Sequence, residues 1–194
     1  GRLNVTPFTP ATVTGTIVTT KTAVTDAYSL GARSFTVWKA PTFDGVFPAE
    51  RVYDSGNFIE TKVLEVNGGF FNADWSTTTG AANLKDTRSD NKGPEPEGIA
   101  FGKAFGKNWL VVGLERDGGI MLFEVSNPAA PQFVQYISTT DWLGGMFNLV
   151  KPAGDVSPEG ILFVEAKNSP TKKPLVIVSY ELSGTVAIFE LNNK

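Results

Sequence analysis

The residues with the clearest potential for chemistry are acidic, and they recur in a pattern. Glu97 and Glu159 each occupy the middle of a Pro-Glu-Gly tripeptide that opens an apolar run, and Glu115 and Glu181 each stand where the next apolar run ends. The chain contains no cysteine and no histidine, which excludes thiol nucleophiles, histidine metal ligands and a Ser-His-Asp triad within the chain. Any metal ion must therefore be held by oxygen, which favours Ca²⁺ or Mg²⁺ over zinc or copper.

Two aspartates precede the Pro-Glu-Gly tripeptides and extend the set of candidate metal ligands. The set is Glu97, Glu115, Glu159, Glu181, Asp90 and Asp155. Clustered carboxylates repel one another and raise one another's pKa unless a cation compensates. Ca²⁺ accepts roughly six to eight oxygens in flexible geometry, which loops of this kind can provide. The pattern therefore predicts a calcium site.

Basic residues beside the acidic ones offer a second chemistry. Arg88, Lys92 and Arg116 could hold an anionic substrate group, because arginine recognises phosphate through paired hydrogen bonds. The same residues are equally ordinary ion-pair partners. The alternative interpretation is structural: the Pro-Glu-Gly glutamates cap backbone amides or pair with these basic residues.

The two Pro-Glu-Gly tripeptides open two units of the same design, over residues 96–137 and 158–191. Each unit reads as a Pro-Glu-Gly strand, an apolar strand ending in glutamate, a glycine turn and an amphipathic strand. The first unit adds a fourth strand, and the second stops after three. A four-stranded unit of about 40 residues has the size of a β-propeller blade. The predicted fold class is all-β and part of a β-propeller, with a two-sheet sandwich as the alternative.

The propeller interpretation divides the chain into four parts. Residues 1–56 are a partial blade, 57–95 a long loop or connector, 96–137 a blade, and 158–194 a last blade that lacks its outer strand. Another segment should then pair with the open strand over 185–189.

The same interpretation predicts where the acidic residues meet. In a propeller blade, the loop before the first strand and the loop after the second open on one face. The four glutamates of the pattern should therefore gather around one mouth of the central channel.

Composition narrows the class of protein and its partners. Of 194 residues, 41% are apolar and 19% charged, so the chain can build a sizeable core. The net charge of −3 argues against a nucleic-acid partner. No apolar run approaches the roughly 20 residues that a transmembrane helix needs. Because the chain begins with Gly1 and not Met, we expect a processed product or a fragment.

Several segments in order resemble one known family. They include Arg88–Gly98 (RSDNKGPEPEG), Gly113–Ile120 (GLERDGGI) and Gly154–Gly160 (GDVSPEG). From about residue 28 to the end, the chain resembles the C-terminal half of the choice-of-anchor I family. That family comprises secreted and surface β-propellers, among them alkaline phosphatase-like proteins and mesenchyme-specific cell-surface glycoproteins.

The resemblance implies a location and a partner. It implies an extracellular or cell-surface protein, with the periplasm as a further option, and a roughly seven-bladed ring of which this chain holds about three to four blades. The family's N-terminal half is absent from these residues. We therefore expect that half, or a second polypeptide, to complete the ring.

Two functions are consistent with these observations. The first is a calcium-dependent phosphoester hydrolase, in which carboxylates hold the metal and Arg88 or Arg116 steadies the phosphate. The second is a non-catalytic surface module for adhesion, envelope architecture or mineral-matrix binding, with structural calcium. Residue types and spacing do not separate the two.

Overall fold

Antiparallel β-strands make up nearly all of the regular structure. The computed structural model describes residues 5–6, 28–29, 33–40 and 50–193. Its elements are β1 (Val5–Thr6), β2 (Tyr28–Ser29), β3 (Thr36–Lys39), β4 (Glu50–Asp54), α1 (Phe58–Val66), β5 (Pro96–Ala104), β6 (Lys107–Leu114), β7 (Gly119–Glu124), β8 (Gln132–Ser138), β9 (Pro158–Val164), β10 (Leu175–Tyr180) and β11 (Thr185–Glu190). One short helix among these strands confirms the all-β prediction for the described residues. In the same residues, no helix combines the length and the apolar character that crossing a membrane requires.

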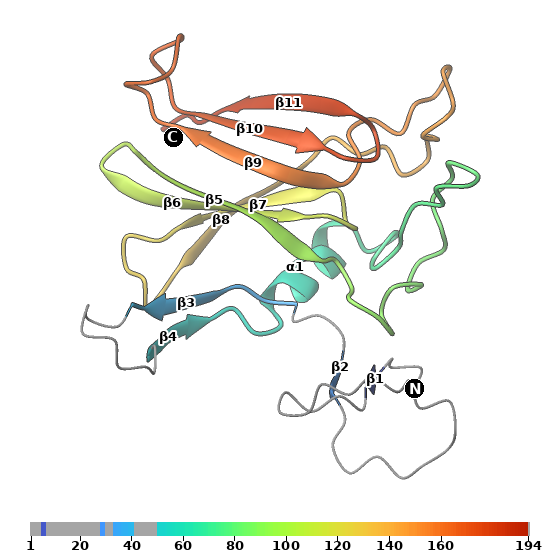
Figure 1. Cartoon of the computed structure of the whole chain (residues 1–194), viewed down its shortest axis with the longest axis horizontal. Coiled ribbons are helices and arrows are strands. Elements are labelled where there is room, and N and C mark those ends of the chain that lie inside the picture. Colours follow the sequence, from blue (N-terminus) through green and yellow to red (C-terminus); the bar gives the residue numbers. More distant parts are fainter. Residues whose placement is uncertain (1–4, 7–27, 30–32, 41–49, 194) are drawn as a thin grey trace, which may run out of the picture.

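Within the described residues the strands form four antiparallel sheets, and two of the sheets are the predicted units. The first unit is the four-stranded sheet β5-β6-β7-β8, and the second is the three-stranded sheet β9-β10-β11. Strands β3 and β4 form a hairpin, and β1 and β2 a short pair. Most of the remaining residues of the predicted partial blade, 1–56, lie outside the described ranges. Figure 1 shows the layers one above another, with β9–β11 at the top of the view, β5–β8 in the middle and β3–β4 below.

The starts of the two units share their backbone geometry. Glu95 and Ser157, the residues before each Pro-Glu-Gly, have positive φ angles of 51° and 63°. The N–H of Glu115 donates to the carbonyl of Glu95, and the N–H of Glu181 donates to the carbonyl of Ser157, each at 2.8 Å. The repeat found in the sequence is therefore also a repeat of backbone hydrogen bonds.

Apolar side chains cover both faces of the four-stranded sheet. One face packs on α1, β4 and the residues before β3, in a cluster that includes Phe35 and Phe123 with their rings at 4.9 Å. The opposite face packs on β9–β11, in a cluster that includes Val111 and Phe163. Burial of these side chains is the main source of stability for the stacked sheets.

Two glycines of β5 allow the first strands of the two units to approach closely. A Cβ at Gly102 would lie 2.0 Å from the ring of Phe163. A Cβ at Gly98 would lie 2.7 Å from the carbonyl oxygen of Glu159. Only a residue without a side chain fits at these positions, so β9 lies directly against β5.

The segment 57–95, predicted to be a loop or connector, contains helix α1. Ile59 and Val63 lie four residues apart and are completely buried, which places both on the helix face that meets the core. The side-chain amide of Asn67, at the end of the helix, donates to the carboxylate of Asp117 at 3.1 Å. Beyond the helix the segment does lack strands, and it is held by a stack in which the rings of Trp75 and Trp142 lie 5.2 Å apart.

Candidate functional site

Glu95, Glu97 and Glu115 lie together where β5 begins and β6 ends. One carboxylate oxygen of each lies within 4.8 Å of those of the other two. Strand pairing explains the grouping: Pro96 pairs with Leu114, so the residues beside them fall at the same end of the sheet. Glu95 and Glu115 are buried and Glu97 is exposed. The sequence analysis predicted that Glu97 and Glu115 would converge, but it did not count Glu95 among the candidate ligands.

Two arginines bind the buried carboxylate of Glu95. Arg88 donates to one carboxylate oxygen, and the Nε of Arg116 donates to the other at 3.2 Å. The Nζ of Lys92 lies 3.6 Å from the same carboxylate. Because the side chain of Glu95 is only 1% exposed, its charge is balanced by these protein groups and not by water.

Further ion pairs join these residues into one network. The guanidinium of Arg116 lies 2.9 Å from Glu115 and 3.8 Å from Asp74, and that of Arg88 lies 3.4 Å from Asp74. Lys92 also lies 3.8 Å from Glu97. We call this set of side chains the rim network. Its members are Asp74, Arg88, Lys92, Glu95, Glu97, Glu115 and Arg116.

The loop that carries Arg88 and Lys92 is fixed from the β3 side of the molecule. Arg33 donates to the backbone carbonyls of Ser89 at 2.6 Å and Asn91 at 2.9 Å, and it also pairs with Glu60 of α1. The basic residues of the rim network therefore sit on an anchored loop. No pattern in the sequence had linked Asp74 or Arg33 to this site.

The two buried glutamates ionise differently. Burial opposes ionisation of Glu95, but Arg116 and Arg88 outweigh it and hold the pKa of that carboxyl below its ordinary value. Burial is also the largest effect on Glu115; Arg116 opposes it, while Glu95 and Glu97 add to it, and the pKa of Glu115 rises to about 7. Glu95 is therefore the ionised partner of the arginines, and Glu115 takes up a proton near neutral pH.

The glutamates of the second unit do not join the rim network. Glu159 and Glu181 occupy the equivalent end of β9–β11, yet both are exposed, and the group of mutually close carboxylates found in the described residues excludes them. The reason lies in the neighbouring residues of the repeat. Ser157 stands where the first unit has Glu95, and Leu182 stands where it has Arg116.

The two predicted aspartates also lie outside the carboxylate group. Asp155 accepts hydrogen bonds from the hydroxyls of Thr139 at 2.7 Å and Thr185 at 2.6 Å. Asp90 is half-buried in the loop before β5. The six predicted metal ligands therefore do not form one site in the described residues, and of the six the close carboxylate group contains Glu97 and Glu115.

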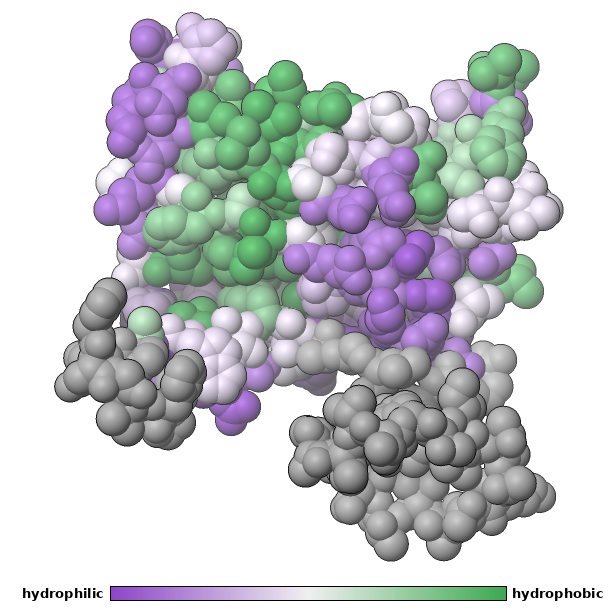
Figure 2. Space-filling model, viewed as in Figure 1, coloured by the Kyte–Doolittle hydropathy of each residue, from purple (hydrophilic) through white to green (hydrophobic). Residues whose placement is uncertain are grey.

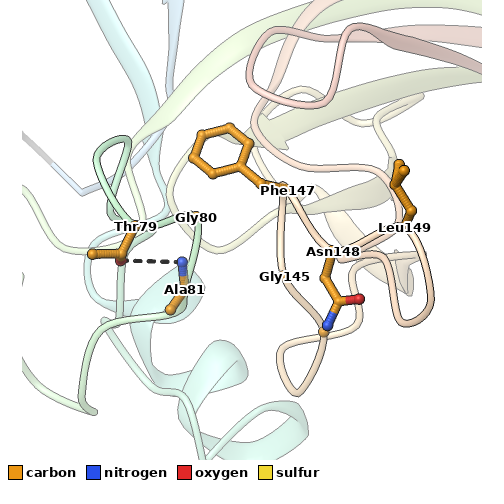
Figure 3. A pocket seen from close by; sticks show the side chains of 8 residues that line it. Thr79, Gly80, Ala81, Gly145, Phe147, Asn148 and Leu149 are labelled. Carbon is orange, nitrogen blue, oxygen red and sulfur yellow. Dashed lines mark hydrogen bonds between the residues drawn. The ribbon is translucent and has the colours of Figure 1, made fainter.

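A separate hollow lies between two loops and shares no lining residue with the rim network. It has a volume of about 490 Å³ and is lined by residues 79–81, 144–145 and 147–149. Figure 3 shows Phe147 and Leu149 on one side of it and Thr79 to Ala81 on the other. No charged side chain lines the hollow, which makes it unsuited to an anionic substrate.

Comparison with known proteins identifies the family of the chain. The sequence model of the choice-of-anchor I domain matches residues 2–128, about two thirds of the chain. The chain belongs to the choice-of-anchor I family. Membership indicates a secreted or surface protein. The matched range includes residues 2–27, which the resemblance seen in the sequence had left out.

A curated relative supports the choice-of-anchor I assignment. Gigasin-3a of Magallana gigas is 29% identical over 168 residues, which cover 84% of this chain. The chain spans 57% of the length of that relative. No solved structure matches the chain.

The rim network of this choice-of-anchor I domain resembles an internal ion-pair cluster more closely than an open metal site. Both oxygens of Glu95 face arginines, and Glu115 faces Arg116. A cation would have to compete with two guanidinium groups for these oxygens. The carboxylate most available to a ligand is that of the exposed Glu97.

Proposed function

We propose that this choice-of-anchor I domain is a non-catalytic module of a secreted or surface protein, in which the rim network is a structural ion-pair cluster. One observation carries the proposal: Arg88 and Arg116, the groups that a phosphoester hydrolase would use to hold phosphate, both bind the buried Glu95. Moving them to a substrate would leave that buried carboxylate with only the longer contact to Lys92, at 3.6 Å, which is costly. Adhesion, envelope architecture or binding to a mineral matrix are the roles of such a module.

A calcium ion at the exposed edge of the rim network is the second candidate. The close approach of carboxylate oxygens from Glu95, Glu97 and Glu115 supports it. Glu97 would be the principal ligand, because it is exposed and its ion pair with Lys92 is long at 3.8 Å. Bound there, Ca²⁺ would neutralise the carboxylates and tie the start of β5 to the end of β6.

Two measurements on the full chain test these proposals. We expect no turnover of a generic phosphomonoester or phosphodiester, with or without a chelator. Metal-dependent turnover that is lost in Arg116→Gln would overturn the non-catalytic proposal. Calorimetric titration with Ca²⁺ addresses the second candidate: heat present in the native chain and absent in Glu97→Gln supports it, and identical heats in the two chains refute it. Glu159→Gln is the matched control, because Glu159 holds the equivalent place in the second unit.

We further propose that the stacked sheets are blades of a β-propeller, about three to four of a roughly seven-bladed ring. A second polypeptide or an N-terminal half would complete the ring. The outer face of β9–β11, the face turned away from β5–β8, supports this proposal. On it, Leu162, Ile177 and Ile188 form one row across the three strands, and Leu162 and Ile188 are 57% and 63% exposed.

The repeat supports another β-sheet as the partner that would cover this face. In the four-stranded sheet the equivalent row is Ala100, Val111 and Leu122, and it packs against β9–β11. A further sheet stacked on the row of the second unit would bury it in the same way. Figure 2 shows a wide hydrophobic surface where Figure 1 places β5 and β9–β11, and large exposed apolar patches mark interaction sites.

Analytical ultracentrifugation of the full chain tests the stacking. Without its partner sheet, the chain should self-associate as its concentration rises, and Ile188→Lys should weaken that association. Val134→Lys, an exposed valine of β8, is the control. A monomer at all concentrations would show that this face needs no partner.

A further inference from the structure

The loop between β8 and β9 carries two apolar side chains at its outermost point. Leu149 and Val150 are 98% and 95% exposed, which is extreme for residues of their size. In Figure 3, Leu149 points away from the loop that carries Thr79 to Ala81. We call this pair the apolar tip.

A side-chain hydrogen-bond arrangement fixes the conformation of the apolar tip. The side-chain oxygen of Asn148 accepts from the N–H groups of both Val150 and Lys151, each at 3.0 Å. The N–H of Asn148 donates to the carbonyl of Gly145 at 3.1 Å, and the N–H of Gly145 donates to the carbonyl of Lys151 at 3.0 Å. The turn therefore holds Leu149 and Val150 outward in a defined way.

The base of the loop is joined to the rest of the protein. The N–H of Met146 donates to the carbonyl of Gly80 at 2.7 Å, and the ring of Phe147 occupies the space beside that glycine. Trp142 stacks on Trp75 at the foot of the loop. The apolar tip therefore projects from a loop whose base is held by a backbone hydrogen bond and by ring stacking.

We propose that the apolar tip inserts into the interfacial region of a lipid bilayer. Leucine and valine side chains gain free energy on leaving water, and nothing in the described protein covers them. Insertion leaves fewer backbone groups to lose water, because the N–H groups of five residues of the loop already have protein acceptors: Gly145, Met146, Asn148, Val150 and Lys151. Lys151, exposed and next to Val150, would remain at the headgroup level.

The shape of the apolar tip favours a lipid surface over a protein partner. A stable protein interface requires a broad complementary surface, of the order of 800 Å² on each partner. The two side chains of the tip, at the edge of the hollow that Leu149 helps to line, do not offer such a surface, whereas a bilayer accepts a protrusion without a matching groove. This inference concerns a different region from the rim network and does not depend on the proposed function.

A single introduced cysteine tests the inference in the full chain. Because the chain has no cysteine, Leu149→Cys takes an environment-sensitive thiol-reactive dye at one site only. Vesicles of phosphatidylcholine, with or without a minor share of phosphatidylserine, are the probe. We expect the dye emission to shift to the blue when vesicles are added, and Val134→Cys, labelled in the same way, to show no shift.

Vesicle co-sedimentation of unlabelled variants supplies the second measurement. Replacing both tip residues, Leu149→Ser with Val150→Ser, should lower the bound fraction at least tenfold, whereas Val134→Ser should not. Lys151→Glu should weaken binding only to vesicles that contain phosphatidylserine. An unchanged dye spectrum, or binding that persists in the doubly substituted chain, overturns the inference. A blue shift that appears without vesicles as the protein concentration rises also overturns the inference, because the apolar tip then contacts a second copy of the protein and not a bilayer.

Discussion

The N–H of Glu115 donates to the carbonyl of Glu95 at 2.8 Å, and this bond sets side by side two buried glutamates with opposite tendencies to ionise. Arg88 and Arg116 stabilise the charge on Glu95, while burial disfavours the charge on Glu115. The pair therefore gives the rim network one permanent anion and one group that titrates near neutrality.

Removing the permanent anion should destabilise the fold. Glu95→Gln would remove the buried carboxylate that Arg88 and Arg116 both contact and leave them only the longer contacts to Asp74 in common. We expect a loss of about 3 kcal/mol in the free energy of unfolding. Urea denaturation monitored by circular dichroism measures it. Glu97→Gln, at the exposed member of the group, should change stability by less than about 0.5 kcal/mol. Equal losses in the two variants would contradict the anchoring role of Glu95.

The titrating glutamate should make stability depend on pH. The pKa of Glu115 is raised from its ordinary value of 4.5 to about 7 in the folded chain. Between these values the folded state holds a proton that the unfolded state has released, so the free energy of unfolding should fall as pH rises from 4.5 to about 7. The cost of ionising Glu115 in the fold is fully present above that range. In Glu115→Gln this decline should be reduced, and denaturation across the same pH range compares the two chains. A Gln variant with the full native decline would assign the effect to another group.

The contact between β5 and β9 should tolerate no side chain at Gly102. Gly102→Ala would place its Cβ 2.0 Å from the ring of Phe163, and we expect a loss of about 1–3 kcal/mol from overpacking. Gly69→Ala is the control, because no atom lies within 4 Å of its Cβ position. Trimming the ring should relieve the clash, so the double variant Gly102→Ala with Phe163→Leu should lose less stability than the sum of the losses in its two single variants. Thermal denaturation compares the native chain with these three variants and the control, and a stable single Gly102→Ala would mean that the sheets do not pack in this way.

The anchor of helix α1 should depend on a tyrosine hydroxyl. The hydroxyl of Tyr136 donates to the buried carboxylate of Asp117 at 2.7 Å, and Asn67 donates to the other oxygen. Burial raises the pKa of Asp117, and these two donors oppose the rise. Tyr136→Phe should therefore cost about 1–3 kcal/mol at neutral pH.

The control for the Tyr136 substitution is Tyr53→Phe, on β4, because the Tyr53 ring packs against the same core cluster. The loss in Tyr136→Phe should be smaller below the ordinary pKa of Asp117, because a protonated carboxyl needs fewer donors. Urea denaturation at two pH values measures both effects. A loss that is the same at both pH values would show that the hydroxyl acts through packing alone.

Much of the fold could be predicted from the sequence, because its signals are local. The alternation of apolar residues and the turn glycines predicted the strands of both units, which occupy residues 96–138 and 158–190 in the structure. The repeat of Pro-Glu-Gly predicted that two units share a design, and the matching hydrogen bonds at Glu95 and Ser157 confirm it. The one helix of the described residues was not anticipated, since it is only nine residues long and buries just Ile59 and Val63, which is a short apolar face.

The sequence by itself determined the strand order, the absence of thiol and imidazole chemistry, and the meeting of Glu97 with Glu115. Each of these depends on residue type or on strand pairing between near neighbours in the chain. Tertiary structure alone decided which carboxylates are neutralised. Asp74 and Arg88 reach the rim network from a loop without regular pattern, and Leu182 in place of an arginine leaves Glu181 outside it. Ion pairing requires contact in space, and loop residues far apart in sequence carry no periodic signal that would reveal that contact.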